Sequence, residues 1–426
     1  MRSFVCVLIV SLIPLSSFAA MQRFTVLQHP AIDYYETEPT DSITQLRKRI
    51  ETGEVRLERD DQHGYLKSLL RALDIDVSSQ ILVTSKTSLQ LKMISPATPR
   101  AIYFNDDTYV GWVQGSPLLE ITTVDPKLGA VFYSIEQQSD RPKIEREFDV
   151  CLQCHNPVAP GHVMTSTVPD ETGTPVFHAG FFATSDRSPL KERWGGWYVT
   201  GTHGDQLHMG NLVLRNLPPA KAGLATTTIK LERTQGANVT DLTTLFDSSK
   251  YLTNYSDIVA LMVLGHQIFV ENQVTELNYA AQKAIHDSPG TDTLKQYEGM
   301  AEELVEAMLL VGEAQLSSSI SGTSGFAEDF QRRGIRDSTG RSLRDLDLQR
   351  RLFKYPLSYV IYSREFDNLP RPARNYVSRR ILEVLNGADQ SPKFNHLSPG
   401  DRQAILQILK ETKPDFVAAS KIGTAR

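Results

Sequence analysis

Five consecutive residues, Cys151-Leu152-Gln153-Cys154-His155, combine two thiols with an imidazole. Thiols three positions apart lie on one turn of a helix, where each can add to a vinyl group at the edge of a porphyrin and form a thioether bond. The next residue, His155, then lies under the ring, where it can bind the iron as the proximal ligand. The run therefore predicts one covalently bound haem c, held by Cys151, Cys154 and His155.

The two thiols have three other interpretations: a disulfide, a thioredoxin-like redox pair, or part of a zinc site. A redox pair needs a βαβ setting, whereas residues 142–150, before the first thiol, are charged and predicted to be irregular. Zinc needs two further ligands, which a single C-x-x-C does not supply. The adjacent histidine and the export signal favour haem, because covalent attachment of haem requires export.

The first twenty residues have the pattern of a secretory signal peptide. Arg2 supplies the positive charge, residues 4–13 are apolar, and Ser17-Phe18-Ala19 has the small-x-small form of a cleavage site. The apolar run is too short to span a bilayer well, and no later stretch is expected to be long and apolar enough for a transmembrane helix. We expect residues 1–19 to be removed, together with Cys6, and the mature protein to be soluble and periplasmic.

The net charge of the chain indicates which classes of partner it is expected to bind. The chain has 426 residues and a formal net charge of −5, which becomes −6 without Arg2 because the signal carries no acid. This mild acidity argues against nucleic acid or an anionic membrane as the main partner. The expected partner is a periplasmic redox protein or a small-molecule substrate.

The elements that must position the motif begin with an N-terminal α+β region at residues 20–145. Amphipathic spacing predicts short helices at 42–50 and 63–75. Four segments rich in β-branched and aromatic residues are separated by turn signals and predict an antiparallel meander with Trp112 and Tyr133 in its core. These segments are residues 101–105, 109–113, 118–124 and 130–135.

The haem segment, residues 146–235, is rich in glycine and histidine. Five of the ten histidines fall between positions 155 and 208. The first candidate for the distal iron ligand is Met209, and the alternatives are His208, His203 and His266.

Two further hypotheses concern the same segment. His203 and His208 with Asp205 could instead bind a second metal, although their spacing does not fit a helical H-x-x-x-H pattern. Arg193 could pair with a haem propionate or form a surface salt bridge.

From residue 236 to residue 426 the pattern is mainly helical. The strongest segment is 257–284, with Ser256 as a plausible N-cap and His266 on its apolar face. A hydrogen-bonded core histidine is the favoured interpretation of His266, with the ligand role as the alternative. Further helices are predicted at residues 297–316, 343–353, 373–385 and 399–412. The predicted fold class is α+β: a β-rich N-terminal region, a loop-rich haem segment and a mostly helical C-terminal domain.

The Cys-Leu-Gln-Cys-His run resembles the attachment motif of c-type cytochromes. The wider pattern also resembles an uncharacterised group of large exported bacterial monohaem proteins, a likeness that implies no activity. It is carried by Tyr103-Phe104-Asn105-Asp106, residues 193–204, 208–211 and 257–267, and Phe353-Lys354-Tyr355-Pro356. The chain is far larger than a small soluble electron carrier.

Two functions are therefore expected. The first is electron transfer by a low-spin haem c with His155 and a distal Met or His as ligands. The alternative is a haem-dependent, peroxidase-like oxidoreductase with an open distal site, where a nearby His or Glu acts as acid or base. A third hypothesis is a protein whose haem senses a gas or a redox state without turnover.

Overall fold

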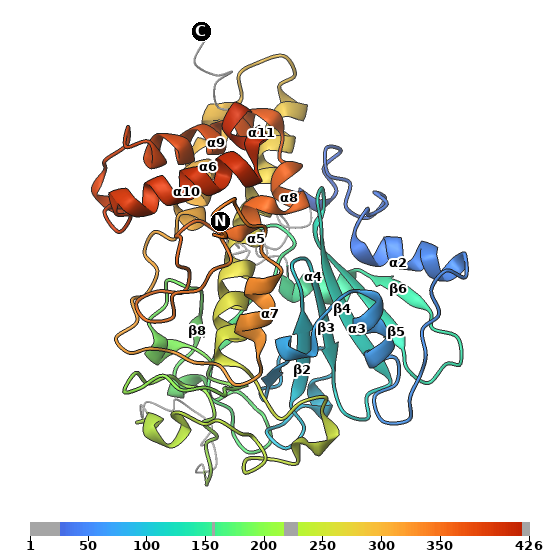
Figure 1. Cartoon of the computed structure of the whole chain (residues 1–426). Helices are drawn as coiled ribbons and strands as arrows, with labels where there is room; N and C mark the ends of the chain where they lie inside the picture. Colours follow the sequence, from blue (N-terminus) through green and yellow to red (C-terminus); the bar gives the residue numbers. More distant parts are fainter. Residues whose placement is uncertain (1–25, 156–157, 217–228, 420–426) are drawn as a thin grey trace, which may run out of the picture.

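The computed structural model describes residues 26–155, 158–216 and 229–419 (Figure 1). The expected signal peptide at residues 1–19, with Arg2 and Cys6, lies outside the described residues. The N-terminal half contains an antiparallel sheet, and the C-terminal region is mostly helical with long loops. The fold class is α+β, as the sequence predicts.

The main sheet has seven strands in the order β6-β5-β4-β3-β2-β1-β9, and every neighbouring pair is antiparallel. The predicted meander is confirmed, because its four segments form β2 to β5 in sequential order. The strands are β1 (Ile81–Val83), β2 (Arg100–Phe104), β3 (Thr108–Trp112), β4 (Leu118–Asp125), β5 (Gly129–Glu136), β6 (Ile144–Glu147) and β9 (Trp197–Tyr198).

Three strands, β1, β6 and β9, come from segments that were not expected to join the sheet. Residues 142–150 were expected to be irregular, but Ile144–Glu147 form the edge strand β6 against β5. The Ser134 hydroxyl donates to Glu147 Oε1 at 2.6 Å and holds this edge. At the other edge, β9 pairs with β1, so the haem segment itself completes the sheet.

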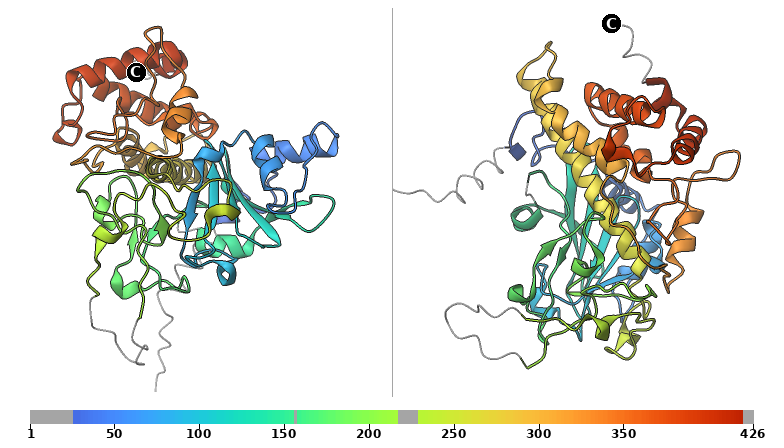
Figure 2. Two further views of the ribbon diagram at one scale, coloured as in Figure 1. Left: turned by 60° about the horizontal axis from the view of Figure 1, so that its bottom comes forward. Right: turned by 90° about the vertical axis from the view of Figure 1, so that its left-hand side faces the viewer.

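The two faces of the sheet are covered differently. One face packs against helices α2 (Ser42–Glu51) and α3 (Leu66–Ala72), and it buries Trp112 and Tyr133, as predicted. The other face packs against the long helix α5 (Ile258–Asp287), which runs between the sheet and the C-terminal helices (Figure 2). The core is therefore layered, with α5 as the element shared by both halves of the chain.

Helix α5 begins one residue later than predicted. Asp257 is the N-cap, and its carboxylate accepts hydrogen bonds from the amides of Val259 and Ala260. The expected cap, Ser256, is instead used in the sheet, where its hydroxyl donates to Tyr198 O and accepts from Leu82 N. Ser256 and Asp257 both have side chains that commonly cap helices. Because Ser256 is used in its contacts with the strands, Asp257 caps α5.

The length and composition of α5 also correct an expectation. Its 30 residues are long and apolar enough to cross a membrane, although no such stretch was expected. However, 78% of its apolar window is buried inside the fold. The helix thus has the surroundings of a core helix, packed on the sheet and on the C-terminal helices.

The C-terminal helices agree with the sequence in part. The segments predicted at 373–385 and 399–412 form α9 and α10, whereas the helix predicted at 297–316 ends at Met308 because Leu310 and Gly312 adopt positive φ angles of 53° and 81°. Residues 343–353 are not helical but form turns with a bridge between Leu346 and Phe353. The helices are α6 (Glu298–Met308), α7 (Phe326–Arg332), α8 (Arg364–Asp367), α9 (Arg371–Leu385), α10 (Pro399–Thr412) and α11 (Pro414–Ala419).

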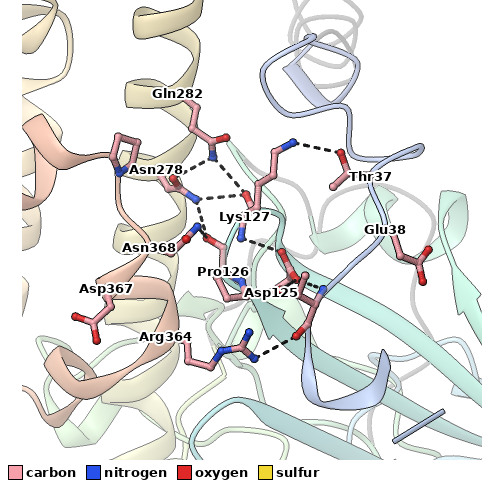
Figure 3. Close-up of a pocket in the computed structure, with 12 residues that line it drawn as sticks. Thr37, Glu38, Asp125, Pro126, Lys127, Asn278, Gln282, Arg364, Asp367 and Asn368 are labelled. Carbon is pink, nitrogen blue, oxygen red and sulfur yellow. Dashed lines mark hydrogen bonds between the residues drawn. The ribbon is translucent and has the colours of Figure 1, made fainter. Parts of the chain in front are cut away.

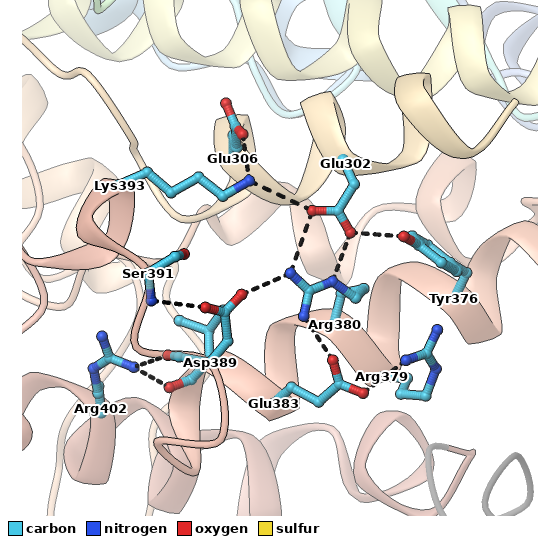
Figure 4. Close-up of polar contacts among 11 residues, drawn as sticks. Glu302, Glu306, Tyr376, Arg379, Arg380, Glu383, Asp389, Ser391, Lys393 and Arg402 are labelled. Carbon is cyan, nitrogen blue, oxygen red and sulfur yellow. Dashed lines mark hydrogen bonds and ion pairs between the residues drawn. The ribbon is translucent and has the colours of Figure 1, made fainter.

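An arginine on α9 joins this helix to α6 (Figure 4). Arg380 donates to Glu302 on α6 at 2.6 Å, to Glu383 at 2.6 Å and to Asp389 at 2.7 Å. Its side chain is only 16% exposed, so these ion pairs are partly shielded from water. The guanidinium holds together three carboxylates that would otherwise repel one another.

Replacing this arginine should therefore destabilise the fold. We expect Arg380→Gln to lower the free energy of unfolding by about 2 kcal/mol, because Asp389 loses its charged partner and Glu302 keeps only the more distant Lys393, at 3.7 Å. The matched control is Arg379→Gln, whose side chain is 36% exposed, pairs with Glu383 and lies over the ring of Tyr376; its cost should stay below about 1 kcal/mol. Urea denaturation of both variants measures the difference, and equal effects would contradict the role of Arg380.

Candidate haem-attachment site

The three motif residues lie on one short helix, α4 (Asp149–His155). His155 is the last residue of this helix. Leu152 is buried and anchors α4 to the core on the α2 side, whereas Cys151 is half-buried and Cys154 is exposed. Neither cysteine forms a disulfide. Both thiols are therefore free to react, on a helix that is fixed from its other side.

The imidazole of His155 is held by the loop that follows it. His155 Nδ1 lies 3.0 Å from Gly161 O, and the ring packs on Phe132 with 5.1 Å between ring centroids. Burial lowers the pKa of His155, so the ring is neutral, with the Nδ1 proton donated to the carbonyl and a lone pair left on Nε2. This is the tautomer that an iron ligand requires.

The pKa of the first thiol, Cys151, is shifted in the opposite direction from that of a redox-active cysteine. Burial, with the nearby carboxylates of Glu147 and Glu120, raises the pKa of Cys151 to about 11. Thioredoxin-like cysteines have lowered pKa values and follow a strand in a βαβ unit. The described strands pair only in antiparallel fashion, whereas a βαβ unit has parallel strands. The interpretation of the two cysteines as a thioredoxin-like redox pair therefore loses support.

A charged pair on the sheet lies close to the motif. Arg100 Nη2 is 2.9 Å from Glu120 Oε2, and the charges of both residues influence the pKa of Cys151 and of His155. The guanidinium covers Gly111, where a Cβ atom would lie 2.6 Å from Arg100 Nη2. Arg100 Nε is buried without a hydrogen-bond partner among the described residues. An unused arginine donor beside the motif fits the carboxylates of a haem.

Apolar side chains near the motif are also left in contact with water. Val150, Val158 and Val163, which flank the motif along the chain, are all exposed. Exposed apolar side chains grouped in one segment are typical of a surface that another group covers. A hydrophobic macrocycle attached to α4 is such a group, so the residues present fit haem.

Arg193 does not have either of the two expected roles. It is buried, and its guanidinium donates to the carbonyl oxygens of Ser188 at 2.7 Å and Asp186 at 2.6 Å. Arg193 therefore holds the backbone of the preceding loop from inside the protein. It does not form a surface salt bridge, and its side chain is not free to bind a propionate.

The first candidate for the distal ligand, Met209, is fully buried. It packs in a small cluster with Val168 and Leu212, separate from the cluster that holds Leu152. Ser166 Oγ lies 3.8 Å from the methionine sulfur, beside the short ribbon formed by β7 (Thr165–Ser166) and β8 (Phe182–Ala183). The ligand role of Met209 remains a prediction.

The alternatives His203 and His208 lie against each other. Their ring centroids are 4.7 Å apart, and both rings are buried. His203 Nε2 accepts from the amide of Asn238, and His208 Nδ1 accepts from that of Gly210. Asp205 is exposed, and no three-ligand group in the described part of the chain includes these histidines. The geometry therefore gives no support to a second metal site at this place.

His266 is a hydrogen-bonded core residue, which confirms the favoured interpretation. Its Nδ1 lies 2.7 Å from Asp186 Oδ2 and its Nε2 lies 2.8 Å from Ser358 Oγ, so no ring nitrogen is free for iron. The order Ser-His-Asp is that of a hydrolase triad. However, Ser358 has no exposed surface, and no substrate can reach its hydroxyl. The three residues instead tie two loops to α5.

One group of functional candidates escaped the sequence interpretation. His162, which follows Gly161, packs on Tyr109 with 4.3 Å between ring centroids and lies 6.4 Å from the His155 ring. Tyr109 donates to Glu271 of α5 at 2.6 Å. A carboxylate on the buried face of an apolar helix was the signal that could have identified this group.

Comparisons with known proteins found no relative. No protein-family model matches the chain, and neither a curated protein nor a solved structure shows significant similarity to it.

The buried contacts of His266 predict a large effect on stability. We expect His266→Leu to lower the free energy of unfolding by about 3 kcal/mol, because Asp186 is left buried without its partner. The matched control is His286→Gln in the last turn of the same helix, where the side chain is half exposed and the cost should be below about 0.5 kcal/mol. Urea denaturation tests both, and a small effect at His266 would contradict its structural role.

A buried carboxyl near α5 makes stability depend on pH. Burial, with Asp107 nearby, raises the pKa of Glu365 from 4.5 to about 8. Between these values the folded protein keeps a proton that the unfolded chain has released, so the free energy of unfolding falls as pH rises. We expect urea midpoints to decrease across this range, and to decrease less in Glu365→Gln. A variant with an unchanged pH profile would show that Glu365 does not titrate in this range.

Proposed function

We propose that this protein is an exported monohaem c-type cytochrome that binds haem covalently and transfers electrons. The observation that carries the proposal is the arrangement on α4: two free thiols, and an imidazole that Gly161 O holds through Nδ1 while Nε2 stays available. When bound, the haem supplies an iron that alternates between the ferric and ferrous states.

The residues around α4 would prepare the site for this cofactor. Leu152 fixes the helix to the core, and Gly161 sets the orientation of His155. Arg100 has a free donor for a propionate, while its Nη2 stays paired with Glu120. The exposed position of Cys154 would leave a haem edge near the surface, where an electron could pass to a periplasmic redox protein.

The second candidate function is a haem-dependent, peroxidase-like oxidoreductase with an open iron. It is favoured by the surroundings of the four candidate ligands: Met209 packs in a cluster separate from that of Leu152, His203 and His208 lie against each other, and both ring nitrogens of His266 are hydrogen-bonded. Glu120, beside the motif, has two carboxylate oxygens without a hydrogen bond and could act as the acid or base of such a reaction.

One spectrum separates the two functions. The exported protein, purified from a host that can attach haem, is measured oxidised and reduced, with and without carbon monoxide. A low-spin spectrum that carbon monoxide leaves unchanged means two protein ligands and supports electron transfer. A high-spin spectrum that shifts with carbon monoxide means an open iron and supports the oxidoreductase.

The attachment residues can be tested one at a time. We expect Cys151→Ser/Cys154→Ser to lose all covalent haem, because no thioether can form. Cys154→Ser alone should keep one thioether, and His155→Ala should lose the proximal ligand and its low-spin signature. Mass spectrometry of the denatured protein detects the attached haem, and far-UV circular dichroism controls for folding. A wild-type mature chain without added haem mass would overturn the proposal.

A further inference from the structure

A carboxyl group lies deep in the protein behind the proposed iron ligand. Glu271, in the middle of α5, is 2% exposed. Its Oε2 accepts a hydrogen bond from Tyr109 at 2.6 Å and lies 3.8 Å from His162 Nδ1. No lysine or arginine in the described parts of the chain pairs with it. Such a group is costly to bury in its charged form, and sites that keep one are often functional.

Among the described residues, the titratable groups that face Glu271 come from several elements, and none carries a permanent positive charge. His162 faces it from the loop after α4, and burial lowers the pKa of this ring to about 3, so it stays neutral. Asp107 and Tyr109 face it from the β2–β3 turn and β3, and Glu365 faces it from α8. Burial also raises the pKa of Glu271 itself, and the neighbouring carboxylates of Glu365 and Asp107 raise it further.

Two more side chains extend the network of hydrogen bonds. Gln267, one turn before Glu271 on α5, donates to the Tyr109 hydroxyl at 2.7 Å and accepts from the Tyr359 hydroxyl at 2.5 Å. The cluster is thus made of groups that can accept, donate or hold a proton.

On one side this cluster reaches the proposed proximal ligand. Gly161 O holds His155 Nδ1, and the next residue is His162, whose Nε2 is buried without a partner among the described residues. Asn272 clamps His162 by accepting from its amide at 3.0 Å and donating to its carbonyl at 2.8 Å. The contacts that connect His155 with Glu271 therefore pass through His162, whose backbone is held by Asn272.

On the other side the cluster approaches water. A cavity of about 700 Å³ lies between the N-terminal loop, the β4–β5 turn, α5 and the α8–α9 region (Figure 3). Arg364 lines this cavity and donates to Thr40 O at 3.1 Å. The charge of Arg364 acts on Asp107, and Glu365 is its neighbour in the chain. The acidic cluster around Glu271 thus extends toward Arg364, one of the residues that line this cavity.

We propose that Glu271 binds a proton each time the haem on His155 is reduced, and releases it on oxidation. The inference rests on the proposed haem attachment. In the balanced step, a one-electron donor reduces ferric to ferrous iron, and a proton from water converts the Glu271 carboxylate to the carboxylic acid. The net charge of the interior does not change. In a medium of low dielectric constant, this makes reduction easier than the addition of an uncompensated electron.

The test is the pH dependence of the midpoint potential of the haem-loaded protein. A tenfold change in proton concentration should change the reduction equilibrium up to tenfold, a fall of up to about 59 mV per pH unit for one electron. We expect this slope in the wild type above the usual carboxyl range, and its loss in Glu271→Gln. Glu276→Gln is the matched control, because this partly buried carboxyl on α5 faces Glu303 and not the cluster.

A second readout is independent of the potential. Infrared difference spectra should show a carboxylic acid C=O band that appears on reduction of the wild type and is missing in Glu271→Gln. If that variant does not fold, Tyr109→Phe replaces it. Loss of the Tyr109 hydrogen bond destabilises the carboxylate, so the pH-dependent range should move to higher pH.

The outcomes distinguish the inference from the proposed function. A haem-loaded wild type with a pH-independent potential, or a Glu271→Gln protein that keeps both slope and band, would overturn the role of Glu271 and leave the haem assignment intact. A protein without covalent haem would instead overturn the proposed function itself.

Discussion

The arrangement of the chain depends on the polar side chains that α5 buries. An unpaired buried donor or acceptor costs about 1–3 kcal/mol, so each of these groups requires one particular partner. Asp257 binds the amides of Thr323 and Ser324, and His266 binds Asp186 and Ser358. Hydrophobic packing alone would tolerate several arrangements of these loops. The polar contacts of one helix select a single arrangement.

The polar side chains of α5 also fix the loop next to the proposed haem-attachment motif. Asn272 holds both backbone groups of His162, and the preceding residue, Gly161, approaches Asn272 so closely that a Cβ atom would lie 2.3 Å from its Oδ1. The carbonyl of Gly161 then holds His155. The carbonyl that orients the proposed iron ligand and the amide that Asn272 binds belong to the same peptide group, so α5 fixes the loop that holds His155.

Patterns in the sequence predicted those elements of the fold that depend mainly on neighbouring residues. Alternation and turn signals located β2 to β5, and the C-x-x-C-H spacing identified α4, because neighbouring residues determine these features. Residues 343–353 have helical apolar spacing, but Leu348 adopts a positive φ angle and the segment folds back through turns. Ser256 and Asp257 are equally suitable caps, and a strand that begins at Trp197 decides between them. Such choices depend on partners far along the chain, which periodicity cannot identify.

The two nitrogens of His155 have different chemical surroundings, and this difference gives the site its character. The Nδ1 side leads through Gly161 and His162 to a cluster of buried acids, whereas exposed valines and an exposed thiol flank the motif along the chain. A charge placed on a metal at Nε2 would therefore act on an interior in which no described lysine or arginine pairs with Glu271. In such an interior a change of charge is more favourable when an opposite charge arrives with it. A proton is the one cation that this network of hydrogen bonds can deliver.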